Sequence, residues 1–301
     1  MSLPSTSRSS TIDKQPQHAH ISQHAWTAAL AAVSPAGSAP HVWLDVGASW
    51  RSLTTWDLEW NASLVVVGVD ALRSNLDDYR QTNNPRFLKV DGACSSSAAP
   101  TVTFYKHASW TCGSLLPTRA DGPKLGRGRQ ACTGDVPKEI TVRQFSLRKL
   151  LGRMRALGAG RIELLKIDVQ GSEFDCLSSG GDELLSVDNI LLEVQDVSNT
   201  SSLLMYDGAK GLAELDPLLA SRGFSRQYCE WNRWARNVRE MNCLYSNTRV
   251  GDGVATWMWA TGNSKRNSSM VSYARERPKG FFDLVNALRT SGDAGARVAK
   301  S

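Results

Sequence analysis

The sequence lacks any apolar run close to the roughly 20 residues that a helix needs to cross a bilayer, although 41% of its 301 residues are hydrophobic. Its first residues also lack the basic and then apolar order of a secretory signal. We therefore expect a soluble cytoplasmic protein, with organellar import through the N-terminal stretch as the open alternative. The chain is long enough to bury one sizeable core.

The cysteines form no C-x-x-C pair and lie far apart along the chain, so neither a zinc site nor a disulfide framework is indicated. The six positions are Cys94, Cys112, Cys132, Cys176, Cys229 and Cys243. We expect them to be buried thiols in a reducing compartment.

Excess positive charge is absent from the middle of the chain. Of the net charge of +6, +5 lies between Gly262 and the C-terminus and +1 lies in the first 40 residues, so residues 41–261 are neutral. A neutral middle argues against an enzyme that follows nucleic-acid phosphates. We expect the basic tail to be a solvated extension.

Composition divides the chain into three parts. Residues 1–40 are predicted to be an N-terminal tail in which "ISQHAWTAALAAV" forms one helix, and 249–301 a basic C-terminal extension. Residues 41–248 are predicted to be the catalytic domain. The histidines at 18, 20 and 24 give only a weak metal signal, because they lie in the tail.

Strand-like and helix-like segments alternate from His41 onward. "HVWLDVG", "SLVVVGVDA", "RFLKVDGACS", "LLKIDV" and "NILLEVQ" are predicted to be buried strands, and "SLRKLLGRMRAL" places its apolar residues on one helical face. "TVTFYKH" and "KEITVRQF" are also strand-like. "FSRQYCEW" and "EMNCLYS" have no helix between them and should pair antiparallel. The sequence therefore predicts an α/β fold, with a mostly parallel Rossmann-like sheet covered on both faces.

An acid stands where each of the predicted parallel strands ends: Asp45, Asp70, Asp91, Asp168 and Glu193. Burial of a carboxylate without a partner costs several kcal/mol. An acid at the end of an apolar strand therefore either pairs with another group for structural reasons or faces a cleft. In parallel sheets, ligands bind at the carboxyl ends of the strands. The repetition at one edge favours a binding site.

The first strand ends in a turn of Asp45, Val46, Gly47, Ala48 and Ser49. With a single glycine it is not the G-x-G-x-x-G that a dinucleotide's pyrophosphate requires. A glycine turn still allows a ligand to approach the backbone, and an acid after the second strand can hold both hydroxyls of a ribose. The pattern suits a nucleoside without phosphate, which points to S-adenosylmethionine.

The blocks "LDVGAS", "VVGVDA", "LLKIDVQGSEFDCL" and "ILLEVQ", in this order, resemble the FkbM-type branch of the class I S-adenosylmethionine-dependent methyltransferases. "CGSLLP" is also similar to a small-residue loop of that family. The resemblance spans roughly residues 41–247. It implies a seven-stranded sheet with an antiparallel last strand, and O-methylation of small molecules or glycans.

The resemblance also implies roles for single residues. It places the methionine-binding turn at Asp45, Gly47, Ala48 and Ser49, the ribose site at Asp70 and Ala71, and the adenine neighbourhood at Asp91, Gly92 and Ala93. Asp168 and Glu173 match signature acids of the family. Where the family commonly has a further glycine in the first turn, this chain has Trp50 and Arg51, and Arg51 either pairs with the cofactor's carboxylate or obstructs the pocket.

Asp168 is the first candidate for the base or substrate anchor of a methyl transfer, because it stands at a strand tip beside the expected methyl donor. Glu193 ends the next strand and should face it, so the pair is a candidate catalytic centre and a candidate Mg²⁺ site. Two structural alternatives stay open. Glu173 could cap its own helix, and Asp91 could be a turn residue.

Three functions remain open on the sequence alone. The favoured one is O-methylation of a small molecule or glycan by S-adenosylmethionine. A nucleic-acid or protein methyltransferase would use the basic tail, and a non-enzymatic relic of the fold would account for Arg51. The sequence carries no signal of the oligomeric state.

Overall fold

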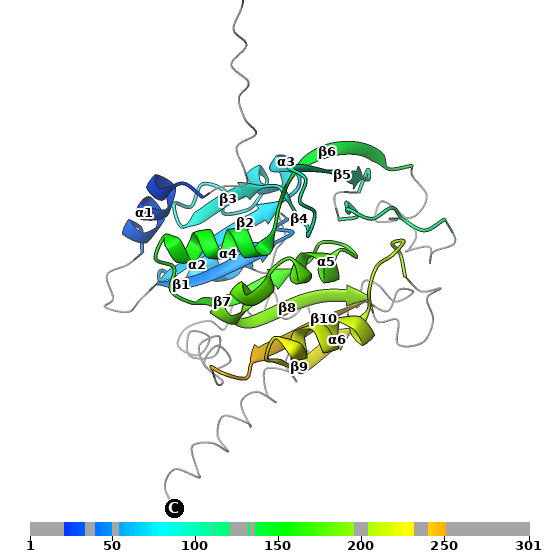
Figure 1. Ribbon diagram of the computed structural model, residues 1–301. Helices are drawn as coiled ribbons and strands as arrows, with labels where there is room; N and C mark the ends of the chain where they lie inside the picture. The colour runs from blue at the N-terminus through cyan, green and yellow to red at the C-terminus, as the bar shows by residue number, and fades with distance from the viewer. Residues whose placement is uncertain are drawn as a thin grey trace, which may run out of the picture.

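The computed structural model describes most of the central part of the chain (Figure 1). The described residues are 21–33, 40–49, 54–109, 111–120, 132, 136–195, 204–231 and 240–250. Arg51, His18, His20 and residues 251–301 of the basic C-terminal extension lie outside these residues, so the structure does not test the hypotheses about them.

Seven of the described strands form one sheet in the order β3, β2, β1, β7, β8, β10, β9. Their bounds are β1 (His41–Val46), β2 (Leu64–Asp70), β3 (Phe87–Asp91), β7 (Ile162–Ile167), β8 (Val187–Gln195), β9 (Phe224–Trp231) and β10 (Glu240–Asn247). Every pairing is parallel except those of β10, which runs antiparallel to both neighbours. The predicted seven-stranded α/β sheet with an antiparallel last strand is confirmed.

The predicted antiparallel pairing of the last two strands is confirmed, and this hairpin of β9 and β10 lies at one side of the sheet. A helix carries the chain from β8 to β9, and β10 then returns into the gap between these two strands. A hairpin needs no crossover, so β10 can pair with β9 on one side and β8 on the other. The edge of the sheet is therefore β9.

Six α-helices and one 3₁₀ helix are described. Their bounds are α1 (Gln23–Ala31), α2 (Thr54–Trp60), α3 (Arg73–Asp77), α4 (Leu147–Ala156), α5 (Glu173–Ser178), η1 (Gly181–Ser186) and α6 (Leu212–Ser221). The side chain of Ser146 caps α4 by accepting the backbone N–H of Lys149. The predicted apolar face of α4 is buried, as Leu147, Leu150, Leu151 and Met154.

The side chains of each strand alternate between two cores. One core joins alternate residues of β1, β2, β7 and β8 to α1, α4, α5 and α6, and these helices lie on the near side of the sheet in Figure 1. The other core joins the intervening residues, such as Trp43 and Val66, to Leu58 of α2 and Leu76 of α3. Asp45, Lys166 and Glu193 lie in the same alternation as this second set, so they share its face of the sheet.

A second, smaller sheet flanks the main one. It contains β4 (Ala93–Cys94), β5 (Thr101–Lys106) and β6 (Lys138–Phe145), with β5 and β6 antiparallel. The two strand-like segments seen in the sequence are therefore confirmed as strands. Phe104 and Val142 on one face of this sheet pack with Ala71 and Leu72 at the end of β2. The small sheet thus adds an apolar wall beside the carboxyl end of β2.

The helix predicted in the N-terminal stretch is present as α1 and belongs to the core. Ile21, Trp26 and Ala29 are buried in the same cluster as α4, and the Arg153 Nε donates to the Ile21 carbonyl at 3.2 Å. Within the described residues, no helix combines the length and apolarity that crossing a membrane takes.

The prediction of free buried thiols is wrong, because all six cysteines are paired. The disulfides are Cys94–Cys176, Cys112–Cys132 and Cys229–Cys243, with sequence separations of 82, 20 and 14 residues. The spacing along the chain carried no sign of these pairs because tertiary contacts bring them together. Cys229 and Cys243 face each other across β9 and β10, whereas Cys94 and Cys176 join the end of β4 to α5.

Removal of the longest-range disulfide is expected to destabilise the fold most. A Cys94→Ala/Cys176→Ala pair should lower the free energy of unfolding by about 2–4 kcal/mol, because the unfolded chain regains the freedom of a long loop. The matched control is Cys229→Ala/Cys243→Ala, whose strands are already hydrogen-bonded neighbours. Urea unfolding of both variants measures the difference, and equal losses would contradict the expectation.

Candidate active site

The glycine turn after β1 is shaped by its contact with the end of β7. Gly47 has φ +83°, and a Cβ at this position would lie 1.8 Å from the carbonyl oxygen of Asp168. The amides of Gly47 and Ala48 both donate to the Val69 carbonyl, at 2.8 and 2.9 Å. The glycine is therefore needed for the close packing of three strand ends, which holds Asp168 directly beside the turn. Ser49, the last described residue of the turn, is half-buried.

Asp45 lies beneath this turn and is fully buried. Its Oδ2 accepts the hydroxyl of Thr54 at 2.6 Å, and its Oδ1 lies 3.3 Å from the Nζ of Lys166. The register that places Asp45 opposite Lys166 in neighbouring strands accounts for the contact. Asp45 thus anchors the base of the site by an ion pair instead of lining its surface.

Asp70 ends β2, and its carboxylate is fixed by donors on one side. The Leu72 backbone N–H and the Asn75 amide both donate to Oδ1, at 2.7 and 3.0 Å. Burial, partly offset by these hydrogen bonds, raises the pKa of Asp70 to about 7. Both of these donors bind Oδ1, so Oδ2 is the oxygen available to the hydroxyls of a ligand.

The predicted adenine neighbourhood splits into an apolar and a charged part. Ala93 is buried and packs with Phe104 and Val142, with Ala71 against the same cluster. Gly92 donates its N–H to the Asp70 carbonyl at 2.8 Å, which joins the ends of β2 and β3.

Asp91 points away from this apolar wall. Its carboxylate lies 3.2 Å from the Nη1 of Arg143 and 3.7 Å from the Nη1 of Arg73. Both arginine side chains are about half exposed. Asp91 ends β3 and forms surface ion pairs, a structural role different from the turn residue considered from the sequence.

Asp168 and Glu193 meet at the tips of β7 and β8. The parallel register pairs Ile167 with Leu192, so the next residue of each strand faces the other. The side-chain amide of Gln170 joins the two, since its Nε2 donates to the Asp168 Oδ1 at 3.0 Å and to the Glu193 Oε2 at 3.1 Å. Asp168 is 27% exposed at its side chain, so solvent and small molecules reach it. The two acids that the strand order places together are therefore joined through Gln170.

The surroundings shift the pKa values of the two carboxyl groups in opposite directions. Burial alone would raise the pKa of Asp168, but the ammonium of Lys166 and hydrogen bonds from Glu193 and Gln170 outweigh it and hold that pKa below its usual range. Burial and the charges of Asp168 and Glu240 raise the pKa of Glu193 well above its ordinary value. Asp168 is therefore the first of the two to ionise, and Glu193 keeps its proton to higher pH.

Lys166 supplies the positive charge that makes this asymmetry. Its ammonium lies 3.2 Å from the Asp168 Oδ2 and 3.3 Å from the Asp45 Oδ1, and the side chain is only 7% exposed. Burial disfavours the charged form, but the carboxylates of Asp168, Asp45 and Glu193 outweigh it and raise the pKa of Lys166 above its ordinary value. The sequence interpretation passed over Lys166, although a lysine two residues before an acid in an apolar strand was a usable signal.

Glu173 acts within the turn that follows β7. Its Oε1 accepts the backbone N–H groups of Val169 and Gly171, both at 3.1 Å, and the residue is 3% exposed. Burial raises the pKa of Glu173 to about 8. Both donors precede α5, so these hydrogen bonds fasten the turn before the helix, and the capping of α5 by Glu173 stays a prediction.

Segments that are distant in sequence from β7 cover the carboxyl edge of the main sheet. The Ser114 hydroxyl donates to the Gln170 carbonyl at 2.6 Å, and the Tyr206 hydroxyl lies 3.0 Å from the Gln170 Oε1. The segments of Ser114 and Tyr206 are joined by backbone bonds, including Arg119 N–H to the Met205 carbonyl at 2.8 Å. No local pattern could have predicted Tyr206 as part of the site.

The site does not fit the Mg²⁺ that the paired acids suggested. The ammonium of Lys166 already occupies one oxygen of Asp168, and its positive charge opposes a divalent cation there. Glu193 keeps its proton to higher pH, whereas a metal needs an ionised ligand. No group of three or more candidate ligand side chains is arranged for a metal in the part of the chain that the structure describes.

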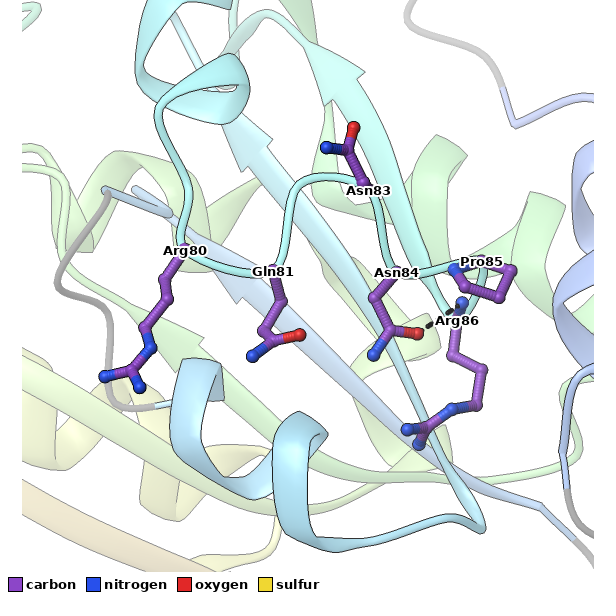
Figure 2. A pocket seen from close by; sticks show the side chains of 6 residues that line it. All are labelled: Arg80, Gln81, Asn83, Asn84, Pro85 and Arg86. Atoms are coloured by element: carbon purple, nitrogen blue, oxygen red, sulfur yellow. Dashed lines mark hydrogen bonds between the residues drawn. The ribbon is translucent and has the colours of Figure 1, made fainter.

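A hollow of about 500 Å³ lies elsewhere, in the loop between α3 and β3 (Figure 2). It is lined by Arg80, Gln81, Asn83, Asn84, Pro85 and Arg86. The loop leads into the start of β3, so the hollow lies at the opposite end of the sheet from the acids. The Arg86 guanidinium is committed to the carbonyls of Leu58 and Leu64, both at 2.9 Å, and Arg80 lies 3.5 Å from Glu59. These contacts give the two arginines structural roles.

Solved structures of similar fold include methyltransferases with different acceptors. The 1,6-didemethyltoxoflavin-N1-methyltransferase of Burkholderia thailandensis, solved with S-adenosylhomocysteine, is 12% identical, with a TM-score of 0.37 over 75% of this chain and 79% of that chain. The magnesium protoporphyrin IX methyltransferase of Synechocystis PCC 6803 is 12% identical, with a TM-score of 0.38 over 75% and 83%. No curated protein sequence matches the chain.

The family is established by the sequence itself. The model of the methyltransferase FkbM domain matches residues 17–225, more than half of the chain. The match includes the ends of β1, β2, β3, β7 and β8, which carry the acids described above. The strand order of the main sheet agrees with this assignment. The chain therefore belongs to the FkbM methyltransferase family.

Proposed function

We propose that the protein binds S-adenosylmethionine at the carboxyl edge of the main sheet and methylates a hydroxyl group of a small molecule or glycan. The observation that carries the proposal is that Asp70, Asp168 and Glu193 lie together at the carboxyl ends of β2, β7 and β8, with the side chain of Asp168 partly exposed. Membership of the methyltransferase family supports the reaction class.

The residues present fit this cofactor. The Oδ2 of Asp70 can accept ribose hydroxyls while Oδ1 stays fixed by the backbone of Leu72. The buried wall of Ala93 and Phe104, with Ala71 against it, offers an apolar surface of the kind that a purine ring requires. When bound, S-adenosylmethionine supplies an electrophilic methyl group on a sulfonium.

The chain contributes an ionised base and a way to keep it in place. Asp168 is the group that would orient the acceptor hydroxyl and take its proton, because it is ionised and reachable from solvent. Glu193, which keeps its proton to higher pH, stabilises the charge of Asp168 by a hydrogen bond. The ammonium of Lys166 compensates the negative charge of Asp168.

A hydroxyl acceptor is favoured over nucleic acid by the distribution of charge along the chain. Residues 41–261 carry no net charge, so this part of the chain has no general attraction for a phosphate backbone. A polar, uncharged acceptor such as a sugar or a small alcohol is compatible with the carboxyl groups of Asp168 and Glu193.

The disulfides indicate the kind of compartment in which the protein works. Three disulfides that use every cysteine of the chain are characteristic of proteins in oxidising surroundings and rare in the cytosol. In place of the cytoplasm expected from the sequence, we propose an oxidising compartment or the cell exterior. The acceptor would then be a molecule present there.

Asp70 predicts a pH-dependent cofactor affinity. Its carboxylate must be ionised to accept ribose hydroxyls, and its pKa in the free protein is about 7. Affinity for S-adenosylhomocysteine should therefore rise with pH through 7 and be about tenfold higher at pH 8 than at pH 6. Asp70→Asn should lower the affinity at pH 8 at least about tenfold and flatten its pH dependence. Calorimetry at both pH values checks this, and an unchanged affinity in Asp70→Asn would contradict the ribose assignment.

Asp168→Asn should separate transfer from binding. The variant keeps the shape of the side chain but removes the base, so methyl transfer should fall by about 10²–10⁴-fold while the affinity for S-adenosylhomocysteine stays within about twofold. The assay follows labelled methyl from S-adenosylmethionine to a panel of hydroxyl acceptors. Asp182→Asn, at an exposed surface ion pair with Arg222, is the matched control. Full transfer by Asp168→Asn would exclude the assigned role.

A further inference from the structure

Gln170, in the turn between β7 and α5, has an unusual backbone conformation. Its φ is +55°, and it is the one non-glycine residue with positive φ in the part of the chain that the structure describes. A glutamine in this region costs about 1–3 kcal/mol and persists only where its surroundings hold it. Gly171 follows with φ +94°, and a Cβ there would lie 2.9 Å from the Tyr206 ring, so the turn is packed tightly on that ring.

The strained turn places the side-chain amide of Gln170 between the two acids of the site. Its Nε2 donates to the Asp168 Oδ1 at 3.0 Å and to the Glu193 Oε2 at 3.1 Å, which uses both amide hydrogens. The carboxyl oxygens require the NH₂ group on their side, so Oε1 faces the hydroxyl of Tyr206 at 3.0 Å and accepts from it. The orientation of the amide is thus determined from both ends.

This arrangement favours ionisation of Asp168 over that of Glu193. Both oxygens of Asp168 accept hydrogen bonds, Oδ1 from Gln170 and Oδ2 from the Lys166 ammonium at 3.2 Å. These two donors, one of them a cation, stabilise the ionised form of Asp168.

We propose that Gln170 is a positioning residue, whose amide holds the carboxyl groups of Asp168 and Glu193 in one orientation and stabilises the ionised form of Asp168. The value of this for methyl transfer rests on the function proposed above; the effect on the acids themselves does not. The strain of the turn is the cost of placing an amide at this point, where a glycine would adopt the backbone without strain.

Other titratable groups face the pair from the neighbouring elements, and none of them is removed when Gln170 is changed. They are Lys166 on β7, Asp45 on β1, Asp70 on β2, Glu173 on α5, Glu240 on β10 and the phenol of Tyr206. A change in the titration of the pair on removal of the amide is therefore attributable to Gln170.

The test is a direct titration of the two acids by carboxyl ¹³C NMR in the full-length protein, assigned with Asp168→Asn and Glu193→Gln. Two variants remove the bridge: Gln170→Gly, which tolerates the positive φ, and Gln170→Asn, whose shorter amide cannot reach both acids. In each, the midpoint of Asp168 should rise by about one pH unit, since it loses a donor to its ionised form. Gln144→Asn is the matched control, because the Gln144 amide is also buried and donates to two acceptors, the carbonyls of Ser95 and Ser97.

Midpoints of Asp168 and Glu193 that match the wild-type protein in a folded Gln170→Gly or Gln170→Asn variant would overturn the proposal. A shift of the same size in Gln144→Asn would also overturn it, because the effect would then follow from loosened packing. If Gln170→Gly does not fold, Gln170→Asn decides. S-adenosylhomocysteine binding is measured in parallel. Shifted midpoints in a protein that does not bind it would leave the positioning role intact and refute the proposed function.

Discussion

The buried ammonium of Lys166 is the interaction on which the rest of the site depends. A charged group with so little exposure costs several kcal/mol unless it is paired, and here it lies between the carboxylates of Asp45 and Asp168. The pairing ties the ends of β1 and β7 together from within. The ammonium stabilises the ionised form of Asp168, so Glu193 is the acid that keeps its proton to higher pH. Its positive charge also excludes a divalent cation from the same place. The asymmetry of the two acids therefore follows from one cation placed beneath them.

The turns around this ion pair share a close-packed backbone. Gly47 lies against the carbonyl of Asp168, and Gly171 lies against the ring of Tyr206, so neither position has room for a side chain. Glu173 fastens the second turn through two backbone N–H groups. The acids of the site thus stand on elements that are fixed by packing and hydrogen bonds, as a site that must orient a small acceptor requires.

Much of this could be predicted from the sequence. Apolar runs that end in acids indicated the parallel strands and the edge where Asp70, Asp168 and Glu193 lie, because strand periodicity and the order of elements are local signals. What the sequence interpretation missed depends on contacts between distant segments. The disulfide Cys94–Cys176 joins residues 82 apart, and the hydrogen bond from Tyr206 to Gln170 crosses 36 positions. The structural role of Asp45 was missed for the same reason, since its partner Lys166 lies on another strand.

The central claim is that this edge of the sheet binds S-adenosylmethionine, and calorimetric titration of the oxidised protein with S-adenosylhomocysteine at pH 8 tests it most directly. The account predicts saturable binding of one molecule per chain in the micromolar range, with the affinity reduced in Asp70→Asn. A folded protein with its three disulfides intact that shows no heat of binding would contradict it, and the acids at this edge would then belong to a site for another ligand.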